Sequence, residues 1–267
     1  MYRRLLIPVQ EPSEVEPLIR FASSLLDADG EVRVLHVIPT RTLPELTRRW
    51  RSSVNLVVPA HEAGAALDIR VDPEVRASVD VAGEILESAE THGTEAIVMT
   101  LSGDRRSVNP FVGHTASAIL HHPPCDVLVV NRLALVESRI PRILVPTFAE
   151  APPPKLLQLA EEIAVHHEGA PIVTLAMATR GQAASAAGRS RSPRGVPIEH
   201  HRSLFPAQLL GTRRRVPEII LHEAAKRRYG LLLIGEEAIH PEGPMLTRRF
   251  LEEMFRRAPC PILAFKG

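Results

Sequence analysis

The chain has 267 residues, of which 45% are hydrophobic and 24% charged, and its formal net charge is +1. This composition is typical of a globular protein with one large domain or two ordinary ones, and it excludes an intrinsically disordered chain. The near-neutral charge excludes a general attraction to nucleic acid or to acidic membranes. No apolar run reaches the roughly 18 residues that indicate a membrane span, so no membrane insertion is expected. The sequence enters a strand pattern without a leader and has two cysteines. We therefore expect a cytoplasmic protein with free thiols.

The first half of the chain alternates buried-strand patterns with amphipathic helix patterns. Gly30 and Gly93 are predicted to end two of the helices. Residues 43–62, which contain the only tryptophan, Trp50, predict no clear element. The predicted strands are residues 5–9, 32–39, 66–71, 96–99 and 127–130, and the predicted helices are residues 17–26, 81–92 and 115–122. Strands that alternate with helices indicate an α/β fold with a doubly wound parallel five-stranded sheet.

The second half repeats the first. The stretch "RLLIPV" at residues 4–9 returns as "RILVPT" at 142–147, and "ILHHPPCDVLVV" at 119–130 returns as "MFRRAPCPILAF" at 254–265. A period of this length indicates a duplicated domain rather than a solenoid, whose units have about 20 to 50 residues. We expect two such α/β domains, residues 1–133 and residues 140–267, that form an intramolecular pseudo-dimer.

Two further expectations follow from the repeat. The last strands of the two halves, Val127–Val130 and Ile262–Phe265, are predicted to meet within one chain, because both are apolar throughout. The middle of the second half departs from the first. Residues 181–195 are small, polar and basic, and they are predicted to form a mobile loop because they bury too little apolar surface.

A glycine-bounded segment follows the fourth predicted strand of the first half. Nine residues separate Gly103 from Gly113, and a Gly-His-Thr sequence opens the next helix. Parallel sheets bind ligands at the carboxyl ends of their strands, and the first N–H groups of a helix can bind a phosphate. Arg105 and Arg106 could close over such a phosphate. The alternative interpretation is an ordinary surface connection in which Gly113 only starts the helix.

Residues 97–130 resemble the closing half of a universal stress protein domain. The resemblance rests on an apolar strand that ends in Met99, on the spacing of Gly103 and Gly113, and on the last strand that follows Cys125. The starts "RRLLIPV" and "VLHVIP" are also similar to this family. The resemblance covers nearly the whole chain and implies a tandem protein of two universal stress protein domains.

In nucleotide-binding members of this family, the strand ends, the loop glycines and the start of the following helix hold the nucleotide. The residues that the resemblance assigns to this role are Pro8, Gln10, Met99, Thr100, Ser102, Gly103, Arg105, Arg106, Gly113, His114 and Thr115. Three of them depart from the family pattern: Gln10 replaces an Asp, Thr100 replaces a Gly, and His114 replaces a Ser or Thr.

The second half matches the pattern less well. Gly235 keeps the first glycine, but Ala238 replaces the second, and Phe148 stands in the place of the Asp. Residues 248–250, Arg-Arg-Phe, open the corresponding helix, where two long cations and a phenylalanine would crowd a phosphate. We therefore predict that the second half binds no nucleotide.

Two functions remain open. The first is a stress-response or signalling protein that binds ATP or another adenine nucleotide through its first domain. The second is a regulatory or interaction module without a nucleotide, which acts with a membrane transporter or is derived from one. Domain pairing within the chain, a homodimer and a protein partner fit either function, whereas nucleic acid fits neither. No nucleophile or Walker-type motif is present, so no enzymatic activity is expected.

Neither the histidines nor the cysteines predict a functional site. The pairs at 121–122, 166–167 and 200–201 have no cysteine or carboxylate at metal-ligand spacing, so no metal is expected. His36 is interpreted as a packed structural residue. Cys125 and Cys260 occupy equivalent places in the two halves and are interpreted as buried, inert thiols.

Overall fold

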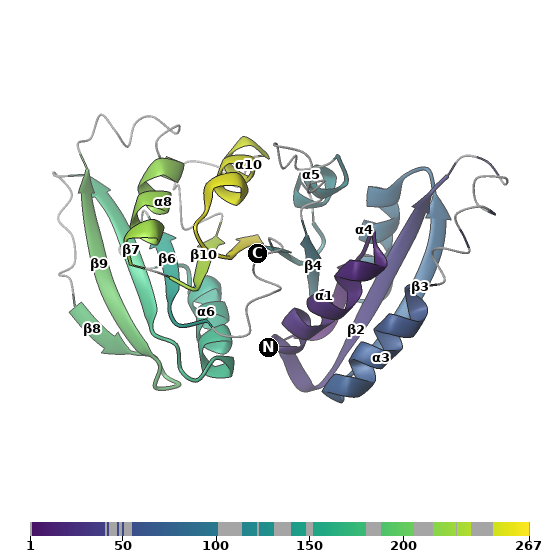
Figure 1. Cartoon of the computed structure of the whole chain (residues 1–267), viewed down its shortest axis with the longest axis horizontal. Coiled ribbons are helices and arrows are strands. Elements are labelled where there is room, and N and C mark those ends of the chain that lie inside the picture. Colours follow the sequence, from purple (N-terminus) through teal and green to yellow (C-terminus); the bar gives the residue numbers. More distant parts are fainter. Residues whose placement is uncertain are drawn as a thin grey trace. The chain divides into compact units, whose positions relative to one another are not determined.

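The chain divides into two compact units, which are described separately (Figure 1). The first unit contains the elements from β1 to β5, and the second contains those from β6 to β11. The computed structural model describes residues 2–40, 42, 47, 50, 55–100, 114–121, 123–130, 140–147, 152–179, 188–205, 216–227, 229–235 and 248–266. The predicted pairing of the two last strands with each other stays a prediction.

The first unit has a five-stranded sheet with the strand order β3-β2-β1-β4-β5. Its strands are β1 (Tyr2–Pro8), β2 (Leu26–Pro39), β3 (Arg70–Ser78), β4 (Ala96–Thr100) and β5 (Asp126–Val130). β1 pairs in parallel with β2 on one side and with β4 on the other. The chain therefore builds the sheet outward from β1 in one direction and then in the other, as a doubly wound fold does.

The helices of the first unit form two pairs. A 3-10 turn, η1 (Pro12–Glu14), leads into α1 (Val15–Ser23), which packs against α3 (Val57–Leu67). α4 (Val81–Thr91) packs against α5 (His114–His121). Local signals fix the bounds of α4: the side chain of Asp80 accepts the Gly83 N–H at 2.9 Å, and Gly93 follows with a φ of 57°. The prediction that Gly93 ends this helix is confirmed.

The second unit repeats this order and adds one strand. Its strand order is β11-β10-β6-β7-β9-β8, in which the first five strands match β5-β4-β1-β2-β3 of the first unit. The strands are β6 (Ile143–Thr147), β7 (Ile172–Thr179), β8 (Gly188–Arg191), β9 (Pro197–Phe205), β10 (Leu231–Gly235) and β11 (Ile262–Lys266). The helices are α6 (Pro154–His166), α8 (Val216–Lys226) and α10 (Arg248–Arg257). This correspondence confirms the duplicated α/β fold.

The duplicated halves differ between their second and third parallel strands. In the first unit, α3 lies between β2 and β3, whereas the second unit has β8 between β7 and β9. β8 pairs with β9 in an antiparallel hairpin, and all of its side chains are exposed. The prediction of a mobile loop over 181–195 is therefore wrong for Gly188–Arg191. Backbone hydrogen bonds to a neighbouring strand order this segment without any apolar burial; residues 181–187 lie outside the described part.

Two local predictions in the first unit are also wrong. The apolar alternation at 66–71 predicted a strand, but Leu67 ends α3, Asp68 turns the chain with a φ of 55°, and β3 begins at Arg70. Gly30 does not end a helix, because it lies inside β2. A Cβ atom at Gly30 would lie 2.6 Å from Cδ2 of Leu26 and 3.0 Å from the carbonyl oxygen of Asp27, so a larger residue there would displace the Leu26 side chain.

Each unit has its own apolar core beneath the helices. In the first unit the strands β1, β4 and β5 bury Leu6, Ile97 and Leu128 completely. In the second unit Leu144, Leu232 and Leu263 are equally inaccessible. Continuous apolar runs are expected in strands that helices cover on both faces. The apolar side chains of the strands therefore form the cores. Polar side chains that could bind a ligand are expected at the ends of the strands.

Candidate functional site

The candidate site of the first unit is the carboxyl-terminal edge of its sheet, where β1 and β4 lie side by side. Leu5 and Leu6 of β1 pair with Ala96 and Ile97 of β4, so both strands run toward the same edge. The chain turns from one winding direction to the other between these two strands, and open α/β sheets bind ligands at this point. β1 ends there at Pro8, and β4 ends at Thr100.

A buried carboxylate that the sequence analysis did not single out occupies this edge. Glu14, at the end of η1, is only 5% exposed. Its Oε2 accepts the backbone N–H of Gln10 at 3.1 Å and that of Glu11 at 3.3 Å. Its Oε1 accepts the side-chain hydroxyl of Thr100 at 2.9 Å. The carboxylate thus joins the segment after β1 to the end of β4.

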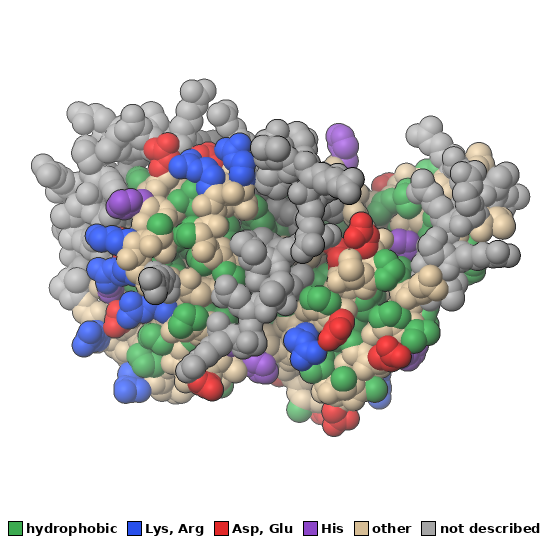
Figure 2. Space-filling model, in the orientation of Figure 1, with side chains coloured by type: hydrophobic (Ala, Val, Ile, Leu, Met, Phe, Trp, Pro, Cys, Tyr) green, Lys and Arg blue, Asp and Glu red, His purple; other side chains and the backbone are tan. Residues whose placement is uncertain are grey.

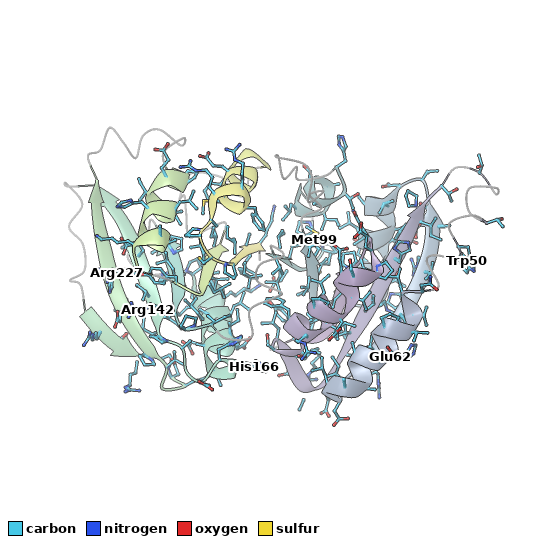
Figure 3. All side chains as sticks on the ribbon, in the orientation of Figure 1. Trp50, Glu62, Met99, Arg142, His166 and Arg227 are labelled. Carbon is cyan, nitrogen blue, oxygen red and sulfur yellow. The ribbon has the colours of Figure 1, made fainter. Side chains whose placement is uncertain are left out.

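The residues predicted for the site have different roles at this edge. Gln10 contributes its backbone N–H, and its side chain is exposed. Thr100 contributes its hydroxyl, while Met99 is buried in β4 (Figure 3). Pro8 ends β1 and is half-buried. Of these four residues, the structure joins Gln10 and Thr100 through their hydrogen bonds to Glu14.

Other predicted residues belong to the segment that leads into α5. His114 opens that helix with an exposed side chain, and the side chain of Thr115 is half-buried. The remaining predicted residues, Ser102, Gly103, Arg105, Arg106 and Gly113, lie outside the described residues.

A histidine next to this edge has a structural role. The Nδ1 atom of His36 on β2 lies 2.9 Å from the carbonyl oxygen of Val9, just after β1. Because a carbonyl oxygen only accepts, Nδ1 must carry the hydrogen and donate it. Val9 is tied to β2 a second time, since its N–H donates to the Leu35 carbonyl at 2.9 Å. These bonds hold the segment after β1 in place and confirm the interpretation of His36 as a packed residue.

Trp50 lies apart from this edge. Its side chain is 45% exposed, and Figure 3 shows it beyond β3, well separated from Met99. The visible face of the first unit carries acidic side chains among apolar ones, with few basic side chains (Figure 2). Within the part of the chain that the structure describes, no three His, Cys, Asp or Glu side chains come together as a metal site.

At the corresponding edge of the second unit, two described residues are involved in helix packing. Gly235 ends β10, as Thr100 ends β4. A Cβ atom at Gly235 would lie 2.8 Å from Cδ2 of Leu156, a fully buried residue of α6. Phe250, in the first turn of α10, is only 5% exposed. Helix packing therefore explains both Gly235 and Phe250 without a ligand.

Local sequence carried a weak signal for Glu14. The sequence Glu-Pro-Ser-Glu at 11–14 places a proline at the first position of a helical turn and a glutamate at the third. A glutamate at the third position commonly reaches back to the N–H that precedes the helix, as Glu14 does to Glu11. This pattern predicts a helix start. It does not predict the contact with Thr100, which is 86 residues away.

The chain therefore consists of two doubly wound α/β units. The first unit has polar hydrogen-bonding groups at its switch point. The sequence profile of the universal stress protein family matches residues 1–131. Through this first half, the chain belongs to the universal stress protein family. No curated protein matches the sequence.

Solved structures of similar fold span the whole chain. A universal stress protein from Archaeoglobus fulgidus is 16% identical, with a TM-score of 0.67 and coverage of 98% of this chain and 97% of the other. A protein of unknown function from Pseudomonas aeruginosa is 12% identical, with a TM-score of 0.59 and coverage of 100% and 93%. The cytoplasmic domain of a prokaryotic cation chloride cotransporter is 11% identical, with a TM-score of 0.56 and coverage of 99% and 95%. At these identities the likeness establishes the fold.

None of the helices in the described part of the chain is long and apolar enough to cross a membrane.

Proposed function

We propose that this protein is a cytoplasmic stress-response or signalling protein that binds ATP or another adenine nucleotide through its first domain, residues 1–133. The observation that carries this proposal is the meeting of the β1 and β4 carboxyl ends at the switch point of the unit that the family profile matches. The spacing of Gly103 and Gly113 supports the same site, because glycines allow a backbone to approach a phosphate closely. The start of α5 adds backbone N–H groups that favour an anion.

The proposed ligand contacts divide between two sides of the site. Pro8, Gln10, Met99 and Thr100 come from the ends of β1 and β4. The loop and helix start contribute the rest: Ser102, Gly103, Arg105, Arg106, Gly113, His114 and Thr115. We propose no metal in this site and no catalytic residue, so nucleotide binding acts as a signal rather than as the first step of a reaction.

The second domain, residues 140–267, is proposed to bind no nucleotide and to serve as the partner of the first within one chain. Two observations support this role. Leu156 fills the space over Gly235, and Phe250 is buried in the first turn of α10. The residues of the first half that align with Gly235 and Phe250 are Thr100 and Thr115, which are both polar.

A second function is favoured by one specific observation. The carboxylate of Glu14 already accepts hydrogen bonds from the N–H groups of Gln10 and Glu11 and from the hydroxyl of Thr100. This is expected if the protein's own side chain has replaced a ligand at the switch point. In that case the protein is a regulatory or interaction module without a nucleotide, acting with a membrane transporter or derived from one. The cytoplasmic domain of a cation chloride cotransporter, which has the same fold, supports this alternative. A homodimer or another protein partner fits either function.

Calorimetric titration with ATP, ADP, AMP and cyclic dinucleotides distinguishes the two functions. The wild-type chain is compared with Gly113→Arg, which copies Arg248 of the second half. Saturable binding by the wild type that is lost in the variant supports the nucleotide function. No binding up to millimolar ligand refutes it and favours the partner-binding function.

A further inference from the structure

The hydrogen-bond donors at the switch point are already committed to a side chain of the protein itself. The N–H groups of Gln10 and Glu11 are consecutive along the chain, and both point at Oε2 of Glu14. Consecutive N–H groups that converge in this way form a concavity that suits an anion. The hydroxyl of Thr100 approaches the other carboxylate oxygen. The three donors have one hydrogen each, and each of these hydrogens is directed at Glu14.

We infer that Glu14 is a specificity-determining residue, which keeps phosphate groups away from the Thr100 side of the site. The inference rests on the proposed function in taking this edge as part of the nucleotide site. Its physical basis is competition. A phosphate beside Thr100 could bind only after Glu14 had left, and the departing carboxylate would have to exchange three hydrogen bonds in a buried position for water. The phosphates of a nucleotide are thereby directed to the α5 side.

This inference changes the interpretation of Thr100. At sequence level, Thr100 is a departure from a glycine pattern and counts against binding. In the structure its hydroxyl is the donor that holds Glu14 at the end of β4. A glycine there would have no hydroxyl to offer, so Thr100 and Glu14 act as one pair. The pair excludes phosphate groups from the Thr100 side of the site. The rest of the proposed nucleotide site is retained.

The test removes Glu14 from the full chain. Glu14→Ala frees the three donors. Glu16→Ala is the matched control, because it makes the same change at a side chain of α1 that is 64% exposed and forms a surface ion pair with Arg20. Glu14→Gln is the second variant, because it keeps the shape and weakens the acceptor. The probes are inorganic phosphate, followed through the amide NMR shifts of Gln10 and Glu11, and ATP, followed by calorimetry.

The inference predicts that phosphate shifts these two amides in Glu14→Ala but not in the wild type or in Glu16→Ala. It also predicts about tenfold tighter ATP binding in Glu14→Ala, since freed donors are offered to the ligand. If Glu14→Ala fails to fold, Glu14→Gln should show the same changes with about a threefold gain for ATP, as a weaker competitor would allow.

The outcomes separate this inference from the proposed function. If ATP binds the wild type and binds Glu14→Ala no more tightly, the inference is overturned and the nucleotide function stands. If no variant binds ATP while phosphate still shifts the amides of Glu14→Ala alone, the nucleotide function fails and the inference stands. Amides that respond to phosphate equally in wild type and variant overturn the inference whatever ATP does.

Discussion

The side-chain hydroxyl of Thr100, at the end of β4, donates a 2.9 Å hydrogen bond to Oε1 of Glu14, which precedes α1. The two residues are 86 positions apart in the sequence. Their contact joins the segment after β1 to the end of β4, and the winding of the first unit changes direction between these two strands. It is therefore a structural tie and, as we propose, the contact that keeps phosphate groups away from the Thr100 side of the site.

Removing the hydroxyl of Thr100 should weaken the first unit. In Thr100→Val the shape is kept but the buried Glu14 carboxylate loses a donor, so we expect a loss of about 1.5 to 3 kcal/mol in the free energy of unfolding. Urea unfolding measures this loss. Thr100→Ser keeps a hydroxyl and should lose clearly less than the valine variant. Equal losses in the two variants would show that the hydrogen bond contributes nothing.

Gly235 should be intolerant of a side chain for reasons of packing alone. Gly235→Ala places a Cβ atom against the buried side chain of Leu156, at 2.8 Å from its Cδ2, and should destabilise by about 1 to 3 kcal/mol. A double-mutant cycle with Leu156→Ala tests the cause, because the cost of the added methyl should shrink once Leu156 is shortened. An undiminished cost in the double variant would mean that the backbone, and not Leu156, requires glycine.

An ion-pair network between β2 and β3 should make stability depend on acid pH. Glu74 bonds to Arg76 at 2.6 Å and to Arg33 at 3.1 Å. Burial alone would raise the pKa of Glu74, but the hydrogen bonds and charges of Arg76 and Arg33 outweigh it and hold that pKa below its ordinary value of 4.5. A lowered folded-state pKa means that the stabilisation is present above pH 4.5 and is lost as the pH falls through the folded-state value.

Glu74→Gln tests this network. The variant should be less stable than the wild type by about 1 to 2 kcal/mol at pH 7, and the difference should shrink at a pH well below 4.5. Urea unfolding at the two pH values provides the comparison. Glu16→Gln is the control, because its exposed pair with Arg20 should contribute little at either pH. A difference for Glu74→Gln that is the same at both pH values would contradict the linkage.

Cys125 should react slowly while the protein is folded. Burial, with a smaller contribution from the charge of Asp126, raises the pKa of the Cys125 thiol from 9.0 to about 11. Only the thiolate reacts, so alkylation at pH 8 should accelerate about a hundredfold when the chain unfolds. Iodoacetamide labelling of Cys260→Ala, with and without urea, isolates Cys125. Rapid labelling of the folded chain would contradict its interpretation as an inert thiol.

The sequence was sufficient to predict the parts of the fold that depend on burial. β1 and β6 were recognised as repeats because a strand that is covered on both faces must be continuously apolar. Local alternation was misleading at the sheet edges. The alternation of Leu67 and Ile69 predicted a strand, although Leu67 ends α3. β8 contains no apolar residue from which a strand could be predicted. Edge elements are held by backbone hydrogen bonds, which side-chain patterns do not report.

The candidate site was only partly predictable for a different reason. The strand ends that carry Gln10 and Thr100 follow from strand order, and the structure brings them together. Glu14 could not be assigned to this edge from sequence, because its contact with Thr100, 86 residues away, depends on β1 and β4 lying side by side in the sheet. Gln10 stands where the family pattern has an Asp, but the carboxylate of Glu14, four residues later, lies at the same edge.

The number of ATP molecules bound per chain shows whether the first unit is the nucleotide site of the protein. It is measured by calorimetry for the wild type, Gly113→Arg and the reciprocal variant Arg248→Gly. We expect one site per chain, lost in Gly113→Arg and unchanged in Arg248→Gly, because in the described part of the second unit Leu156 packs against Gly235 and Phe250 is buried at the start of α10. Two sites in the wild type, binding that survives Gly113→Arg, or no saturable binding at all would contradict it.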